Sequence, residues 1–257
     1  MRVNPVKAAL NAGETVVGVV LQVATQPSIV RIMANAGYDF VFLDNEHSLV
    51  PSNALLDMVQ MARATGISPL VRPADTEYHL LARMLDTGAD GLIVPRVENR
   101  EQARHLVDCC KFPPVGRRGC GTTATLDYRG GDWGEAVAWL NEQTMIVPQV
   151  ESLAAIDALD DILDVPGMDA ILVGPLDLSI NMGIPGRYHD PAFVAAVERV
   201  IAVCEKRHVP SGIAVATPDA VRPWAERGMR FLVCGFDGWM LLDTATAYVE
   251  AIRSIRR

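Results

Sequence analysis

Two acidic residues, Glu151 and Asp177, stand just after two consecutive apolar segments of the sequence. Carboxylates at the ends of neighbouring strands can share one hard cation, with water and substrate oxygens completing an octahedral shell. This chemistry favours magnesium or manganese, with cobalt as a further candidate. Each acid taken alone is more typical of a helix N-terminus. Gln149 lies two residues before Glu151, on the same side of the strand, so a metal site is the favoured interpretation.

A second polar cluster, from Asp44 to His47, follows an earlier apolar segment. An imidazole beside a carboxylate can act as a general base near neutral pH. Either Asp44 or Glu46 could orient the imidazole of His47. The alternatives are a histidine that caps a helix or binds a metal. Because Pro51 and Ser52 supply a separate helix start, we expect a catalytic role for His47, with Glu46 more structural than Asp44.

Arg72 ends a further apolar segment, immediately before a proline. A guanidinium there can bind a carboxylate through two parallel hydrogen bonds and can stabilise the negative charge of an enolate. The alternative is an ion pair with Asp44 or Asp75, and a buried arginine can fulfil both roles. The three lysines of the chain, at positions 7, 111 and 206, all lie away from predicted strand ends. A Schiff-base mechanism needs a lysine amine in the site, so the sequence argues against one.

The elements that must position these residues alternate between short β-rich segments and segments with helical periodicity. Such alternation predicts parallel strands joined by crossover helices, and eight strands suggest a closed (β/α)8 TIM barrel. An open Rossmann-type sheet is the main rival, but no G-x-G-x-x-G follows an early strand. The predicted strands are Val16 to Val23, Phe40 to Asp44, Pro69 to Arg72, Gly91 to Pro95, Met145 to Gln149, Ala170 to Val173, Gly212 to Ala216 and Phe231 to Cys234.

No linker or composition shift divides the chain, so residues 1–257 are predicted to form one domain. The Gly-, Arg- and Thr-rich segment from Pro113 to Trp133 is too long for an ordinary connection, and we expect it to be a loop near the site. Barrel enzymes take their catalytic groups from the C-terminal ends of the strands. The polar residues described above all occupy such positions.

Composition narrows the class of partner. A formal net charge of −8 and a pI near 5.1 argue against nucleic acid as a partner. Five cysteines without paired C-x-x-C spacing fit free thiols in a reducing compartment, so we expect a cytoplasmic protein. Neither a signal peptide nor an apolar run long enough to span a bilayer is evident, so no membrane partner is expected.

Six sequence motifs occur in an order that resembles the HpcH/HpaI aldolase family, whose members include aldolases of 4-hydroxy-2-oxo acids and of 2-keto-3-deoxy sugar acids. The resemblance covers nearly the whole chain and implies a barrel of the phosphoenolpyruvate/pyruvate-domain type. It also implies reversible cleavage of a 4-hydroxy-2-oxo acid to pyruvate, or a close analogue such as hydroxypyruvate, and an aldehyde through an enolate. The motifs are D-N-E-H, V-R-P, L-D-T-G-A-D-G-L-I-V-P, P-P-V-G-R-R-G, Q-V-E-S and G-P-L-D-L-S.

The resemblance also implies a role for each site residue. Glu151 and Asp177 would hold the cation, and Arg72 would stabilise the enolate beside Gln149. His47, supported by Asp44, would move the proton of the C4 hydroxyl group. Asp86, in the L-D-T-G-A motif, is carried over as a neighbour of the site. The carboxylate of pyruvate would bind at the backbone of Gly174, Pro175 and Leu176, although proline has no N–H to donate.

Three positions depart from the residues that are common in the family, and they concern the substrate pocket. Leu176 stands where a small residue is frequent, Val20 where a tryptophan is frequent, and Ala214 where a bulkier aliphatic residue is common. These changes leave the natural aldehyde, the stereochemistry, the pathway and the physiological metal open. The family further implies a homohexamer, a trimer of dimers, in which a C-terminal helix is exchanged between subunits.

Three alternatives remain beside the aldolase. An acyl-CoA lyase of the malyl-CoA or citrate-lyase β type shares the barrel and the Glu/Asp metal site, but His47 and the lack of a basic groove for CoA argue against it. An oxaloacetate decarboxylase would use the same enolate chemistry. A binding protein without activity would be expected to have lost some of the catalytic side chains, whereas His47, Arg72, Glu151 and Asp177 are all present.

Overall fold

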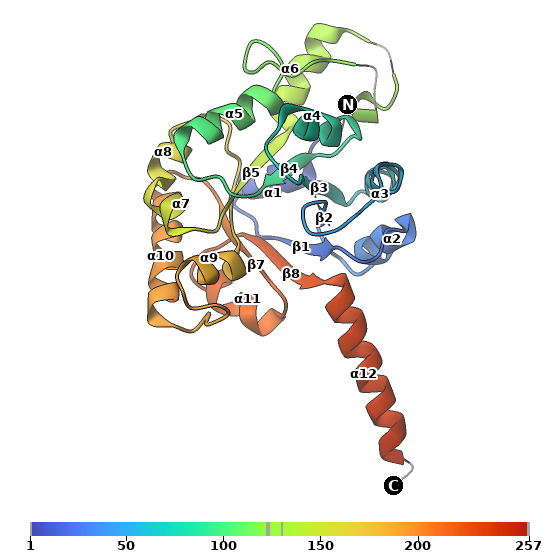
Figure 1. The fold of residues 1–257 in the computed structure, drawn as a ribbon. Coiled ribbons are helices and arrows are strands. Elements are labelled where there is room, and N and C mark those ends of the chain that lie inside the picture. The colour runs from blue at the N-terminus through green and yellow to red at the C-terminus, as the bar shows by residue number, and fades with distance from the viewer. Residues whose placement is uncertain (1, 122–123, 130, 256–257) are drawn as a thin grey trace.

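The eight strands form a closed parallel barrel in chain order, with β8 hydrogen-bonded to β1 (Figure 1). The computed structural model describes residues 2–121, 124–129 and 131–255. The barrel confirms the predicted (β/α)8 fold. The strands are β1 Val16–Leu21, β2 Phe40–Asp44, β3 Ser68–Arg72, β4 Gly91–Val94, β5 Met145–Val150, β6 Ile171–Val173, β7 Ser211–Val215 and β8 Phe231–Phe236.

Helices form an outer layer around the barrel, and side-chain or proline caps begin most of them. The Asn99 side chain, for example, accepts a hydrogen bond from the backbone N–H of Gln102 at the start of α5. The helices are α1 Pro5–Asn11, α2 Pro27–Asn35, α3 Ser52–Thr65, α4 Tyr78–Asp86, α5 Arg100–Cys110, the 3-10 turn η1 Ala124–Leu126, α6 Trp133–Gln143, α7 Leu153–Asp157, α8 Leu159–Leu163, α9 Pro175–Asn181, α10 Pro191–Lys206, α11 Pro218–Ala225 and α12 Asp237–Ile255.

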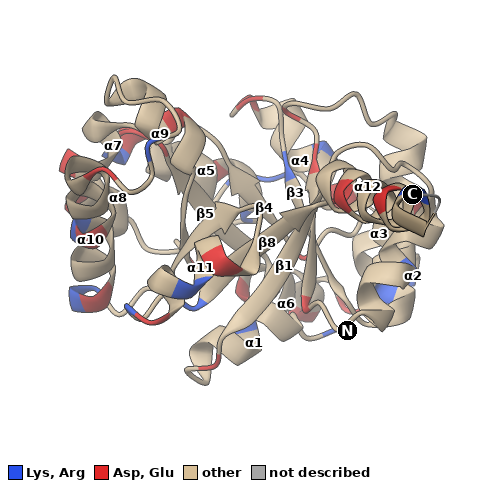
Figure 2. Cartoon of the chain, turned by 90° about the horizontal axis from the view of Figure 1, so that it is seen from below, with Lys and Arg blue, Asp and Glu red and all other residues tan. Residues whose placement is uncertain are grey.

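The strands are buried on both faces, which explains their nearly continuous apolar sequence. Inward-facing side chains fill the barrel, where the rings of Phe40 and Phe231 stack with centroids 4.8 Å apart. Gly18 is required beside them, because a Cβ at this position would lie 2.2 Å from the Phe40 ring. Charged side chains gather mainly on the helices and loops around this apolar barrel (Figure 2).

The strand boundaries differ from the sequence prediction by one or two residues, and the difference at the end of β1 has a clear cause. β1 ends at Leu21 rather than at Val23. The buried carboxylate of Asp237 accepts hydrogen bonds from the backbone N–H groups of Gln22, Val23 and Ala24. Those N–H groups therefore bind a side chain from the start of α12, and the chain turns away from the barrel.

We expected the segment from Pro113 to Trp133 to be a loop near the site, but its described part packs mainly at the other end of the barrel, although the backbone N–H of Gly119 donates to the hydroxyl of Tyr78 at the start of α4. The side chain of Arg118 hydrogen-bonds Asp86 at 2.7 Å, and the hydroxyl of Thr125 donates to the carbonyl oxygen of Leu85. Both partners lie at the C-terminal end of α4, so these bonds hold the segment at the opposite end of the barrel. Positions 122, 123 and 130 lie outside the described residues.

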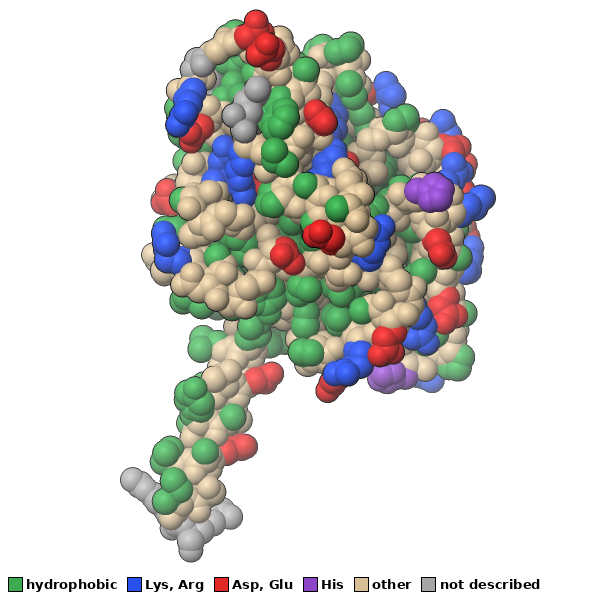
Figure 3. All heavy atoms as spheres, turned by 180° about the vertical axis from the view of Figure 1, so that it is seen from behind, with side chains coloured by type: hydrophobic (Ala, Val, Ile, Leu, Met, Phe, Trp, Pro, Cys, Tyr) green, Lys and Arg blue, Asp and Glu red, His purple; other side chains and the backbone are tan. Residues whose placement is uncertain are grey.

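Helix α12 leaves the barrel and projects away from it (Figure 1). Apolar side chains lie along its exposed surface, among them Trp239, Leu242 and Tyr248, and Figure 3 shows hydrophobic side chains over much of its length. Within the described part of the chain, no helix is both long enough and apolar enough to cross a bilayer.

Candidate active site

Arg72 and Asp44 form a buried ion pair at the C-terminal ends of β3 and β2. The Nε atom of Arg72 lies 2.8 Å from one carboxylate oxygen of Asp44, and Nη2 lies 2.8 Å from the other. The register of the two strands places these residues directly opposite each other. Although burial opposes ionisation, this two-point pairing lowers the pKa of Asp44 and raises that of Arg72. Gln22 adds a hydrogen bond of 2.6 Å to the same carboxylate.

Glu46 is the centre of a second set of contacts, which joins three sequence regions. One carboxylate oxygen lies 3.3 Å from Nη2 of Arg96, and the other lies 3.3 Å from Nη1 of Arg72. The imidazole of His47 is also near, with Nε2 3.8 Å from Glu46. The side chain of Glu46 is only 8% exposed, whereas that of His47 is 58% exposed. A buried acid therefore stands beside an imidazole that solvent or substrate can reach.

Asp44 contacts His47 through the backbone instead of the imidazole. One of its carboxylate oxygens accepts hydrogen bonds from the backbone N–H groups of Glu46, at 3.0 Å, and of His47, at 3.4 Å. Both oxygens are also bonded to Arg72. The acid beside the imidazole is thus Glu46, while Asp44 shapes the loop that carries His47. This arrangement revises the expectation that Asp44 supports the imidazole and Glu46 is merely structural.

Glu151 is buried just after β5, and no cationic side chain among the described residues contacts it directly. Its oxygens accept a hydrogen bond from the backbone N–H of Arg96, at 2.8 Å, and another from Nε2 of Gln149, at 2.6 Å. Burial is the main cause that raises the pKa of Glu151 to about 7. The nearby carboxylates of Asp177 and Glu46 contribute to this rise, and the backbone hydrogen bond from Arg96 opposes it. A carboxylate in such a place needs a proton or a cation.

Asp177 comes from the first turn of α9, which begins directly after β6 and has Pro175 at its start. The backbone approaches Glu151 closely here, because a Cβ on Gly174 would lie 2.7 Å from a Glu151 oxygen and 2.6 Å from Nε2 of Gln149. Leu176 is 54% exposed beside this turn. The region that the sequence predicted to bind substrate, Gly174 to Leu176, therefore adjoins both predicted metal ligands.

The predicted residues converge on one end of the barrel, with one exception. Asp86 lies at the C-terminal end of α4, where it pairs with Arg118, so the structure does not bring it to the strand ends of its own barrel. A helix that returns from the end of β3 to the start of β4 must end at the opposite face. The expected position of Asp86 beside the site is corrected within this chain.

Arg96 is the residue that the sequence analysis missed. It follows β4, with the backbone in the left-handed region at φ 57°, and contacts both Glu46 and Glu151. The motif V-P-R at the end of the fourth strand was the available signal, since Arg72 occupies the same kind of position in V-R-P.

The charges at this end of the barrel do not balance without an added cation. Four carboxylates, from Asp44, Glu46, Glu151 and Asp177, face the two guanidinium groups of Arg72 and Arg96. Among the described residues, no group of three or more His, Cys, Asp or Glu side chains is arranged to enclose a metal ion. The donor set thus fits a hard divalent cation held by two carboxylates, with its other positions open to water and substrate.

Comparisons with known proteins identify relatives that match nearly the whole chain. The sequence profile described as HpcH/HpaI aldolase/citrate lyase matches residues 19–244. The 2-keto-3-deoxy-L-rhamnonate aldolase of Escherichia coli K12 is 32% identical over 251 residues, or 98% of this chain and 94% of that protein. The crystal structure of an HpcH/HpaI aldolase from Desulfitobacterium hafniense DCB-2 is similar with a TM-score of 0.92 and 35% identity, over 96% of each chain.

A more distant structure shows the shared fold alone. The citrate lyase β subunit from Mycobacterium tuberculosis, complexed with oxaloacetate and magnesium, has a TM-score of 0.58 and 15% identity, over 88% of this chain and 93% of that one.

Fold, site and comparisons define the protein as a (β/α)8-barrel carbon–carbon lyase of the aldehyde-lyase class. The chain belongs to the HpcH/HpaI aldolase/citrate lyase family, which confirms the resemblance found in the sequence.

Proposed function

We propose that this enzyme reversibly cleaves a 4-hydroxy-2-oxo acid to pyruvate, or a close pyruvate analogue, and an aldehyde. The observation that carries the proposal is the buried Glu151, which lies beside Asp177 and Gln149 and within the field of Arg72. An acidic pocket that demands a cation, next to a buried guanidinium and an accessible imidazole, contains the groups that a retro-aldol cleavage needs.

Glu151 and Asp177 are the proposed metal ligands, with magnesium or manganese as the preferred ions and cobalt as a substitute. When bound, the cation would polarise the 2-oxo group of the substrate as a Lewis acid. The hydrogen bond from Gln149 and the backbone N–H of Arg96 hold the two oxygens of Glu151 in place. These bonds orient the carboxylate and limit its freedom before the cation arrives.

Arg72 and Gln149 would recognise the pyruvate half of the substrate. Nη1 of Arg72 lies 3.5 Å from the side-chain oxygen of Gln149, so the two groups face the same space. Asp44 fixes the guanidinium through two hydrogen bonds, which keeps the positive charge ready for the negative charge that develops on cleavage. The backbone from Gly174 to Leu176 would bind the carboxylate.

His47 would accept the proton of the C4 hydroxyl group, directly or through water, while the C3–C4 bond breaks. Its exposed imidazole leaves room for substrate, and Glu46 beside it would stabilise the protonated imidazole. The same proton would return to the aldehyde oxygen in the synthetic direction. Asp44 acts in this scheme through Arg72 and through the backbone of the His47 loop.

The runner-up activities are supported less well. The aldolase relatives are 32% and 35% identical to the chain, whereas the citrate lyase β subunit shares 15%. His47 and Glu46 supply a base for a hydroxyl proton, which decarboxylation of oxaloacetate does not need. A decarboxylase activity would use the same pyruvate enolate and is therefore expected as a side reaction.

The test is pyruvate release from a panel of 4-hydroxy-2-oxo acids by enzyme stripped with a chelator, with and without added magnesium or manganese. We expect metal-dependent pyruvate formation that His47→Ala strongly reduces and Glu151→Ala abolishes. Circular dichroism of each variant checks that it folds. Full activity in the stripped enzyme, or no pyruvate from any substrate, would contradict the proposal and direct attention to CoA thioesters and oxaloacetate.

A further part of the proposal concerns assembly: the chain, one barrel domain, forms a hexamer in which α12 packs against a neighbouring copy. The support is the apolar surface of α12, on which Trp239, Leu242 and Tyr248 are 61–71% exposed in the single chain. Light scattering after size exclusion tests this. Leu242→Glu combined with Tyr248→Glu should reduce the assembly, whereas Glu250→Gln on the same helix should not. A monomeric wild-type protein would contradict the proposal.

A further inference from the structure

Arg96 is held in an unusual backbone conformation at the end of β4. Its φ of 57° lies in the left-handed region, which residues other than glycine seldom adopt. The conformation directs its backbone N–H to Glu151 at 2.8 Å. The same bond fixes where the Arg96 side chain begins, immediately beside the proposed metal ligand.

The guanidinium of Arg96 extends from the end of β4 to Glu46 and Ala74. Nη2 donates a hydrogen bond to the carbonyl oxygen of Ala74 at 3.2 Å and lies 3.3 Å from a Glu46 oxygen. The other oxygen of Glu46 lies near the imidazole of His47. Arg96 and the proposed base thus flank the same carboxylate, so the guanidinium lies on the side where the aldehyde half of the substrate would be released.

The two arginines of the site differ in what they can still bind. Arg72 is 8% exposed, and its Nε, Nη1 and Nη2 atoms all contact Asp44, Glu46 or Gln149. Arg96 is 59% exposed, and both contacts that its side chain makes with described residues use Nη2. Its remaining N–H groups can therefore form the two-point interaction that guanidinium groups make with a carboxylate.

We propose that Arg96 binds a carboxylate on the aldehyde half of the substrate, so that the preferred acceptor aldehyde is an acid. This inference rests on the proposed aldolase function and specifies its substrate class. Glu46 places Arg96 when the pocket is empty, and the carboxylate of the aldehyde would share the guanidinium when the pocket is filled. An aldehyde without a negative charge would leave those N–H groups to solvent.

The experiment compares acidic and neutral aldehydes in the synthetic direction, with pyruvate and magnesium or manganese. The pairs are glyoxylate with glycolaldehyde, and succinate semialdehyde with butanal. For the wild type we expect the higher kcat/KM with the acid of at least one pair. Arg96→Gln should lower the acid-to-neutral ratio of kcat/KM by about 10- to 100-fold, the range for a lost hydrogen bond between charged groups.

Two control variants show whether the lost charge matters at this position. Arg96→Lys keeps the charge and should retain part of the ratio. Arg199→Gln removes an arginine of similar exposure, 56%, from α10 and should leave the ratio unchanged. A ratio that Arg96→Gln does not change, or a wild type that prefers the neutral aldehyde in both pairs, would overturn the inference. Equal losses with acidic and neutral aldehydes would overturn it too, because they would mean that Arg96 only supports Glu46 and Glu151.

A separate readout distinguishes this inference from the proposed function. Exchange of the pyruvate methyl protons with deuterated water, followed by NMR, reports enolate formation without any aldehyde. Metal-dependent exchange together with an unchanged ratio in Arg96→Gln would overturn the inference about Arg96 alone. The absence of exchange in the wild type would overturn the proposed function, and the inference about Arg96 with it.

Discussion

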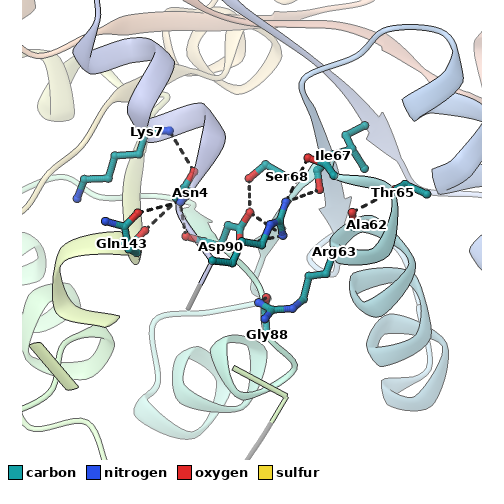
Figure 4. Close-up of polar contacts among 12 residues, drawn as sticks. Asn4, Lys7, Ala62, Arg63, Thr65, Ile67, Ser68, Gly88, Asp90 and Gln143 are labelled. Atoms are coloured by element: carbon teal, nitrogen blue, oxygen red, sulfur yellow. Dashed lines mark hydrogen bonds and ion pairs between the residues drawn. The ribbon is translucent and has the colours of Figure 1, made fainter. Parts of the chain in front are cut away.

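The two ends of the barrel both bury charged side chains, but they arrange them differently. At the end where the strands begin, Asp90 accepts a hydrogen bond of 2.7 Å from Ser68 and lies 3.2 Å from Arg2 (Figure 4). Lys7 pairs with Asp169 at 2.7 Å on the same side. At the other end, Glu151 accepts two hydrogen bonds but has no ion pair with any residue that the structure describes, and burial together with two neighbouring carboxylates raises its pKa.

We interpret the cluster around Asp90 as structural and the cluster around Glu151 as the proposed active site. Where the strands begin, each carboxylate of the cluster is paired with a cation or a neutral hydrogen-bond donor. These contacts join the N-terminal segment to the barrel and do not call for a bound ion. Where the strands end, carboxylates outnumber guanidinium groups. Their mutual repulsion destabilises the folded protein when no cation is bound. Such a surplus is expected where a cation and an anionic substrate must bind together.

The largest effect on activity should come from neutralising the carboxylate of Glu151. Glu151→Gln should lower kcat/KM for pyruvate formation by at least about 1000-fold, since the proposed metal loses one of its two protein ligands. The folded state should survive, because the neutral amide replaces a carboxylate whose ionisation burial opposes. Titration calorimetry with manganese should detect a loss of binding. Full metal affinity in this variant would contradict the role of Glu151.

At the end of the barrel where the strands begin, we expect the contribution of Lys111 to folding stability to depend on pH. Lys111 donates a hydrogen bond of 2.7 Å to the carbonyl oxygen of Asn141, and burial lowers its pKa from 10.5 to about 8. Between these pH values the unfolded chain binds more protons at Lys111 than the folded chain does. The contribution of Lys111 to stability therefore rises with pH, by at most about 3 kcal/mol from pH 8 to 10.5.

Urea unfolding of the wild type and Lys111→Met, measured across that pH range, isolates this contribution. Other groups that titrate there, such as the buried thiol of Cys110, are present in both proteins and cancel in the difference. The free-energy difference between the two proteins should change in favour of the wild type as pH rises. A constant difference would show that Lys111 titrates normally.

Asp90→Asn makes the same chemical change as Glu151→Gln, but in the balanced cluster. We expect it to destabilise the protein by about 1–3 kcal/mol, because Arg2 loses its charged partner and the hydroxyl of Ser68 loses a charged acceptor. Activity of the folded fraction should stay within about twofold, since no strand-end residue moves. Denaturant unfolding and steady-state kinetics on one preparation measure both. A large fall in kcat without loss of stability would remove the distinction between the two clusters.

The smallest effect is predicted at the rim of the pocket. Leu176→Ala should change stability by less than about 0.5 kcal/mol, because the side chain is exposed. It should alter the KM for larger aldehydes by about 10-fold or less, the range for small apolar changes in a pocket. Kinetics with aldehydes of increasing length provide the measurement. An unchanged KM for every aldehyde would place Leu176 outside the pocket.

The local sequence pattern alone predicted much of the fold and many residues of the candidate site. The apolar segments fix eight strands because strands buried on both faces must be continuously apolar, and the polar residues that end them must meet at one end of a parallel barrel. His47, Arg72, Gln149, Glu151 and Asp177 were found in this way, as was the exclusion of a lysine mechanism.

Only the tertiary structure decided which of these residues touch. The family resemblance implied that Asp44 supports His47, yet Arg72 from the next strand pairs with the Asp44 carboxylate and leaves Glu46 beside the imidazole. The tertiary structure also places Arg96 at the site and Asp86 at the opposite end of the barrel. Sequence determines which residues stand at strand ends, whereas the closure and register of the barrel determine the distances on which pairing and pKa depend.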